Sequence, residues 1–213
     1  MIRQSILWLV IAMTLTGTGW VRAIAKNGVA VEKQKILQMF KEREKRIKAL
    51  LDASISSEVQ RERLKKEING IFDFESMAKI ALGERWKTLT PEQQREFVDA
   101  FARLIRENSL RKLDIYRAEV EYLDVAVKGD QARLKTRATY KDKQTTIDYE
   151  LIRKNGRWYV VDFLLDDVST AHAYQKSFAR IMKKHGYSGL LERIRRKVAS
   201  LRRRHQKKEG STS

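Results

Sequence analysis

Four consecutive runs with strand character, joined by three short turns, constrain the fold of this chain more than any other feature. The runs cover residues 118–128, 131–141, 144–153 and 157–166, and the last turn is Asn155-Gly156. Asn-Gly is the strongest short-range hairpin signal, because both central residues of a type I′ turn need a positive φ. Such short connections join only antiparallel neighbours, so the sequence predicts a four-stranded antiparallel meander.

The alternation of side chains along the runs predicts one apolar face and a bend. In the second run Leu134 lies on the apolar face and Lys135 on the opposite one. In the first run the alternation changes phase at Tyr122-Leu123, which predicts a β-bulge and therefore a curved sheet. The other two turns are expected at Gly129-Asp130 and Asp142-Lys143. Helices must cover the apolar face, because only helical patterns remain in the rest of the chain.

Amphipathic helical patterns precede and follow the meander. The clearest start is Thr90-Pro91-Glu92-Gln93, which combines a capping Thr, a Pro at the first helical position and a Gln that completes a capping box. After the meander, one helix is expected to begin at Ser169 or Thr170 and to end at Gly186. This order predicts an α+β fold with a helical subdomain. The expected divisions are a helical part over 26–117, the sheet over 118–166, a second helical part over 167–198 and a disordered basic tail over 199–213.

The N-terminus has the pattern of a secretory signal peptide. Arg3 precedes an apolar run over residues 5–15, and Ala23-Ile24-Ala25 fits the small-x-small cleavage rule. We expect cleavage after Ala25, which would remove residues 1–25 and make the mature protein periplasmic or secreted. The alternative is a retained membrane anchor, but the apolar run is shorter than the roughly 18–20 residues that a membrane span needs.

A strong positive charge is concentrated at the C-terminal end. The formal net charge is +18, and residues 192–213 hold nine Lys or Arg and two Glu. Such a segment is typical of nucleic-acid binding, but the predicted export argues against a nucleic-acid partner. Two interpretations stay open, namely contact with an anionic lipid surface and a solvated helix without a specific partner.

The side chains that usually carry catalysis do not gather into a motif. The sequence has no cysteine, and its histidines (His172, His185, His205) lack partners at metal-ligand spacing. Asp148 and Glu150 share one face of the third strand, which is more typical of a solvated polar face than of an acid–base pair. Asp162 lies within an apolar strand, and we expect it to pair with a sheet arginine such as Arg137 or to lie at a bulge. The sequence therefore predicts a protein that is not an enzyme, with carboxylate catalysis in a cone-shaped sheet as the alternative.

Two sequence blocks resemble the MlaC/toluene-tolerance family. The first is FDFESMAKIALGERWKTLTPEQQREFVDAF over 72–101, and the second spans 156–194. The chain departs from the family pattern at Asp167, where Gly is usual, and at Gln175, where Arg is common. Residues that match the pattern of the second block are Trp158, Asp162, Val168, Ser169, Tyr174, Phe178, Gly186 and Leu190.

The resemblance implies a periplasmic phospholipid-binding component of the Mla lipid transport system. It implies a cystatin-like sheet of the nuclear-transport-factor-2-like kind within a lipid-binding domain over 26–198, and no catalytic residues. Implied partners are a phospholipid, the MCE-domain protein of an inner-membrane ABC transporter and an outer-membrane lipoprotein–porin complex. We expect a monomer that has no cofactor and carries phospholipid as cargo.

The expected lipid site is an apolar cavity between the sheet and its covering helices. The headgroup would stay near the mouth, in solvent. An enzyme in the same cone and a basic membrane-surface binding protein are the alternative functions. The residues expected to line the cavity are Trp86, Phe97, Phe101, Ile105, Tyr140, Tyr149, Leu151, Phe163, Val168, Tyr174 and Phe178.

Overall fold

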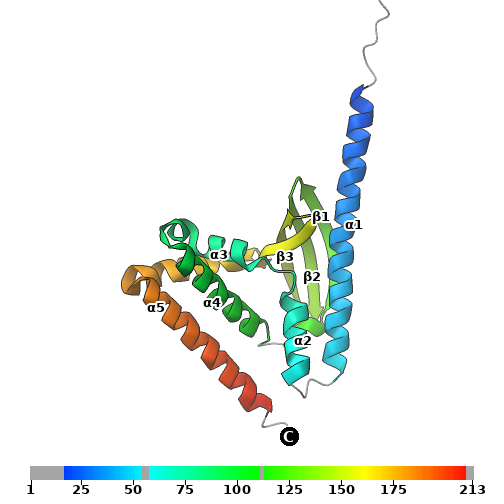
Figure 1. Cartoon of the computed structure of the whole chain (residues 1–213). Coiled ribbons are helices and arrows are strands. Elements are labelled where there is room, and N and C mark those ends of the chain that lie inside the picture. The colour runs from blue at the N-terminus through cyan, green and yellow to red at the C-terminus, as the bar shows by residue number, and fades with distance from the viewer. Residues whose placement is uncertain (1–16, 54–57, 111–112, 210–213) are drawn as a thin grey trace, which may run out of the picture.

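A computed structural model describes residues 17–53, 58–110 and 113–209 and confirms the α+β fold. Its centre is an antiparallel meander with the strand order β1-β2-β3-β4-β5 (Figure 1). The fifth strand is short and was not anticipated from the sequence. It follows a tight turn at Asp166-Asp167, where both residues have positive φ. The strands are β1 (Glu119–Lys128), β2 (Gln131–Tyr140), β3 (Lys143–Lys154), β4 (Arg157–Leu165) and β5 (Val168–Ser169).

The hairpin turns follow the local signals at two of the three positions. Asn155 and Gly156 have φ of 50° and 74°, as a type I′ turn requires. The turn expected at Asp142-Lys143 lies one residue earlier, because β3 begins at Lys143 and pairs it with Tyr140. Cross-strand pairing explains this shift. The pairing of apolar β2 and β3 residues on one face fixes the register, and this register leaves only residues 141 and 142 for the loop.

Two bulges bend the sheet. The register of β1 against β2 shifts between Tyr122 and Asp124, so the predicted bulge in the first strand is confirmed. A second shift lies in the β3–β4 pairing, where Glu150 pairs with Asp162 and Leu151 with Val160. Asp162 therefore lies beside a bulge, as one of the two expectations for it proposed.

The long helix α1 (Gly17–Asp52) covers part of the apolar face of the sheet. Its Ile36 and Phe40 are buried against β2, β3 and β4, and α2 (Glu58–Asn69) packs beside α1. The predicted cleavage after Ala25 falls within α1, whereas the apolar run over 5–15 lies outside the described residues. In the described part of the chain, no helix is long and apolar enough to cross a membrane. The sheet cluster consists of Ile36, Phe40, Ile71, Val125, Ala132, Leu134, Leu151, Trp158 and Val160.

Three helices form a second layer at the opposite side of the molecule from α1 (Figure 1). They are α3 (Phe74–Leu82), α4 (Pro91–Ser109) and α5 (Thr170–Glu209). The capping box predicted at the start of α4 is present, with the Thr90 hydroxyl accepting from the Gln93 amide and the Gln93 side chain accepting from the Thr90 amide. The buried members of this helical cluster are Met77, Ala78, Ala81, Leu82, Leu89, Phe97, Ala100, Phe101, Leu104, Ile105, Ala171, Phe178, Leu190, Leu191, Ile194, Val198 and Leu201.

Helix α5 bends at Gly186, where φ is 67°, and its second half folds back along α4. The bend confirms that the first helix after the sheet ends at this glycine. The second half continues to Glu209, beyond the expected end of the folded domain at residue 198. The prediction of a disordered tail over 199–213 is corrected for residues 199–209, which are helical. Leu201 explains the extension, because its side chain is 1% exposed in the helical cluster.

A buried carboxylate joins α2, α4 and α5. Glu107 is 3% exposed and accepts hydrogen bonds from Lys65 Nζ at 3.2 Å and from Arg202 Nε at 3.0 Å. Burial alone would raise the pKa of Glu107, but the bonds from Arg202 and Lys65 outweigh it and hold this pKa below the ordinary 4.5. The ionised carboxylate therefore stabilises the folded state.

This carboxylate predicts a pH dependence of stability that Glu107→Gln should reduce. Its stabilising contribution is fully present above pH 4.5, the ordinary pKa, and is lost as the pH falls through the lower folded-state value. At pH 7 we expect Glu107→Gln to lower the free energy of unfolding by about 1–3 kcal/mol. In urea titrations the gap between the two proteins should narrow with acidification. A gap that stays constant down to pH 3 would contradict this role.

Candidate functional site

Most of the residues expected to line one cavity are divided between the two apolar clusters. Phe97, Phe101, Ile105 and Phe178 are buried in the helical cluster, whereas Leu151 is buried in the sheet cluster. Tyr140 and Val168 belong to neither cluster. Trp86, Phe163 and Tyr174 are partly buried against the helical cluster, and Tyr149 against the sheet cluster.

The aromatic rings of the helical cluster pack directly against one another. Phe101 lies 5.7 Å from Phe97, 5.3 Å from Tyr174 and 5.8 Å from Phe178, measured between ring centroids. Phe97 and Phe101 are 0% exposed. The Tyr174 hydroxyl also accepts a hydrogen bond from Asn108 Nδ2 at 3.0 Å, which connects α5 to the end of α4. Phe97 and Phe101 therefore form the packed interior of this layer, and Tyr174 lies at its edge.

On the sheet side, α1 covers the apolar face that we had expected α4 and α5 to cover. The Phe40 ring lies 4.7 Å from the Tyr149 ring. Burial, with a smaller contribution from Glu44, raises the pKa of Tyr149 to about 12. Tyr122 donates its hydroxyl to Glu44 Oε2 at 2.7 Å and closes the edge of the sheet cluster.

A hollow of about 290 Å³ lies where β4, β5 and α5 meet, and we call it the β5–α5 hollow. Tyr174 of the helical cluster forms one wall of it. Two apolar side chains are exposed beside it, Leu165 at 43% and Val168 at 63%. Two of the residues that line the hollow, Val168 and Tyr174, were expected from the sequence. The other five were not, although Leu165 continues the apolar pattern of β4. The hollow is lined by Leu165, Val168, Ser169, Thr170, Ala173, Tyr174 and Ser177.

Asp162 holds the wall of the hollow in place. It is 1% exposed, and its Oδ1 accepts hydrogen bonds from the amides of Phe163 at 2.8 Å and Ala171 at 2.9 Å. The Ser169 hydroxyl donates to Oδ2, and the same hydroxyl oxygen accepts from the His172 amide at 3.0 Å. These contacts occupy the carboxylate and fix the first turn of α5 against β4, which gives the Asp and Ser of the second sequence block a structural role.

Other charged side chains that the sequence singled out form ion pairs within the sheet. Asp148 is buried and ion-paired with Arg133 Nη2 at 2.7 Å. Arg137, the arginine that the sequence analysis named as a partner for Asp162, instead pairs with Glu121 Oε2 at 2.9 Å. Within residues 17–53, 58–110 and 113–209, no His, Asp or Glu side chains form a group that could hold a metal ion.

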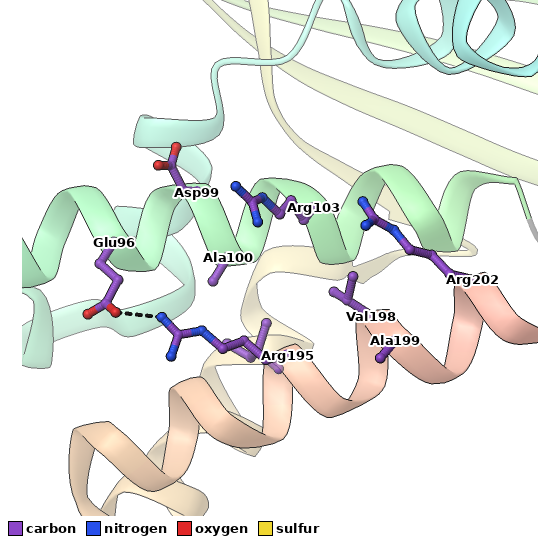
Figure 2. A pocket seen from close by; sticks show the side chains of 9 residues that line it. Glu96, Asp99, Ala100, Arg103, Arg195, Val198, Ala199 and Arg202 are labelled. Carbon is purple, nitrogen blue, oxygen red and sulfur yellow. Dashed lines mark hydrogen bonds and ion pairs between the residues drawn. The ribbon is translucent and has the colours of Figure 1, made fainter. Parts of the chain in front are cut away.

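A second depression, the α4–α5 groove, lies between α4 and the returning half of α5 (Figure 2). Its volume is about 370 Å³ and its floor is apolar, but its rim is charged. An ion pair of 2.6 Å between Arg195 Nη2 and Glu96 Oε1 crosses the groove and joins the two helices. The groove is lined by Glu96, Asp99, Ala100, Arg103, Ile194, Arg195, Val198, Ala199 and Arg202.

Comparisons with known proteins agree with the fold and with the sequence resemblance. The model of the MlaC protein family matches residues 34–196. A solved structure of a phospholipid-binding protein from Ralstonia solanacearum, in complex with a phospholipid, matches with a TM-score of 0.68 and 20% identity over 79% of this chain and 97% of that chain. At this identity the likeness shows a common fold. Among curated proteins, none matches. Because the family model covers most of the chain, including both sequence blocks, the chain belongs to the MlaC family.

Proposed function

We propose that this protein is a phospholipid carrier that holds acyl chains in the apolar interior beside the β5–α5 hollow. Family membership over residues 34–196 supports this most strongly. The related fold of the Ralstonia protein, whose structure contains a phospholipid, supports it as well. The protein would be exported, would act as a periplasmic monomer and would need no cofactor besides its cargo.

The physical reason for such a carrier is the cost of exposing acyl chains to water. Two chains hold roughly 30 methylenes, and at about 0.8 kcal/mol each their exposure costs on the order of 20 kcal/mol. Unassisted diffusion across an aqueous compartment is then negligible. A carrier whose interior resembles the bilayer as a solvent removes this cost. The free energy of the lipid is then similar in the carrier and in the membrane, so both loading and unloading are possible.

The border between the two clusters is where we place the cargo. Phe72 packs against both clusters, and its ring lies 5.9 Å from that of Phe163. The hollow of about 290 Å³ is near the lower end of ligand sites, which span roughly 300–1,000 Å³. We infer that two acyl chains enter by widening this border, with the helical layer moving away from the sheet. Exposed Leu165 and Val168 would then mark the mouth.

Family membership also suggests where the lipid comes from and goes. We propose that the protein receives or delivers phospholipid at the MCE-domain protein of an inner-membrane ABC transporter and at an outer-membrane lipoprotein–porin complex. The bound headgroup would stay at the mouth in solvent, so recognition would depend on the acyl chains more than on the headgroup.

Lipid extraction from the exported protein tests the proposal. The full chain, expressed with its own N-terminus and purified without detergent, should copurify with about one phospholipid per molecule in native mass spectrometry. The mature protein should begin at Lys26. A second exported protein, one that has no apolar site for lipid, is purified in parallel and controls for adventitious lipid. A homogeneous lipid-free protein that also takes up no phospholipid from vesicles would overturn the carrier function.

A further inference from the structure

The outward face of the returning half of α5 has a different character from its buried face. Leu190, Ile194, Val198 and Leu201 recur every three or four residues and are buried against the rest of the helical layer. In a helix of 3.6 residues per turn, Arg196 and Arg203 lie opposite this stripe, and the exposed Arg193, Lys197 and Arg204 lie along one flank of it. One helix therefore combines an apolar stripe with a cationic face.

Several cations of this segment have no acidic partner, in contrast to those that face α4. Arg195 pairs with Glu96, and Arg202 with Glu107. Lys197, Arg203 and Arg204 are exposed, and within the described residues no carboxylate lies in ion-pair distance of them. Cations that stabilise no internal contact are available for an external anionic partner.

Two contacts attach the segment that carries these cations to the helical layer. Leu201 is buried, and the Arg202–Glu107 bond ties the same turn to α4. The family model ends at residue 196, so the turns that carry Lys197, Arg203 and Arg204 lie beyond the matched region. These turns of α5 therefore lie outside the matched segment, and the burial of Leu201 argues against a merely solvated tail.

We propose that the outward face of α5 binds the surface of an anionic phospholipid membrane. The exposed large apolar side chains of the described residues lie on α1, α2, β1, β4, β5 and the turn before β1, and none of them on α5. A protein interface normally has an apolar or aromatic centre, which this face lacks. A diffuse row of cations on a convex helix suits a lipid surface, where each nearby Lys or Arg contributes on the order of 1 kcal/mol.

This surface site is independent of the cargo site, and the two can be tested on the same protein. Sedimentation of the full chain with phosphatidylcholine vesicles that contain about one third phosphatidylglycerol measures surface binding. We expect binding at low salt, release at about 0.5 M salt because of screening, and little binding to pure phosphatidylcholine. Copurified phospholipid, quantified separately in each preparation, reports on the cargo site.

A charge-matched pair of variants localises the effect. The triple variant Lys197→Gln, Arg203→Gln and Arg204→Gln should bind anionic vesicles on the order of a hundredfold more weakly and keep its copurified lipid. The control triple Lys128→Gln, Lys143→Gln and Arg157→Gln removes the same charge from exposed positions at the sheet turns and should bind like the wild type.

Three results would overturn the proposal. Equal loss of binding in both triples would mean that net charge, and not this face, attracts the vesicles. Undiminished binding of the α5 triple, with unchanged helix content by circular dichroism, would place the contact elsewhere. Failure to bind anionic vesicles together with salt-sensitive binding of polyglutamate would indicate an acidic protein partner instead of a membrane.

Discussion

Replacing Leu165 and Val168 together by glutamate is expected to remove copurified phospholipid and to leave the fold intact. Both side chains are substantially exposed beside the β5–α5 hollow, so the substitutions leave no cavity in either cluster. If acyl chains pass over them, each carboxylate must lose hydration next to hydrocarbon, which costs several kcal/mol. A loss of about 3 kcal/mol weakens the affinity for lipid about a hundredfold, which lowers the lipid occupancy of the purified protein. Phosphate analysis of the purified protein measures the occupancy.

Leu123→Glu is the matched control for this double variant. Leu123 lies at the bulge of β1, is 41% exposed and takes no part in the hollow. It should retain its lipid and its melting temperature. Full lipid content in the double variant would place the mouth somewhere else on the molecule.

Phe101→Ala is expected to lower the free energy of unfolding of delipidated protein by about 3–5 kcal/mol. Its ring is fully buried among Phe97, Tyr174 and Phe178, so truncation leaves a cavity that the neighbouring rings can fill only in part. Urea titration followed by tryptophan fluorescence measures the change. For the same reason Phe101→Arg would unfold this layer, which makes position 101 unsuitable for testing lipid contact.

Tyr174→Phe is the comparison variant, and it should lower the free energy of unfolding much less than Phe101→Ala. The variant keeps the ring on Phe101 and removes the hydroxyl that accepts from Asn108, for an expected loss of about 1 kcal/mol. Equal effects of Phe101→Ala and Tyr174→Phe would contradict a tightly filled helical cluster.

Features that depend on a few neighbouring residues were predictable from the sequence. The Asn155-Gly156 turn, the capping box at Thr90, the bulge after Tyr122 and the helix end at Gly186 are all present in the structure. The turn, the capping box and the helix end are each determined by a backbone conformation or a hydrogen bond within about four residues. The bulge was visible as a change of phase in the alternation along one strand. Together with the apolar alternation, they were sufficient for the fold class.

The division of the lining residues could not be derived in this way. Alternation shows that Tyr149 and Leu151 share a face, but it does not show which helix covers that face. In the structure Phe40 of α1 lies on Tyr149, whereas Phe101 packs against Phe97 and Phe178 within the helical cluster. Which helix covers this face depends on contacts between segments that are distant in sequence. The same holds for residues 199–209, whose helix depends on the burial of Leu201 rather than on local signals.

The bend at Gly186 determines whether α5 packs within its own molecule. No neighbouring atom would obstruct a side chain at this position, but φ of 67° is unfavourable for any residue with a Cβ. Relief of that conformation would straighten α5 into one uninterrupted rod and carry Leu190, Ile194 and Leu201 away from α4. The apolar stripe of α5 would then face solvent, because the surface that covers it belongs to the helical cluster of the same molecule.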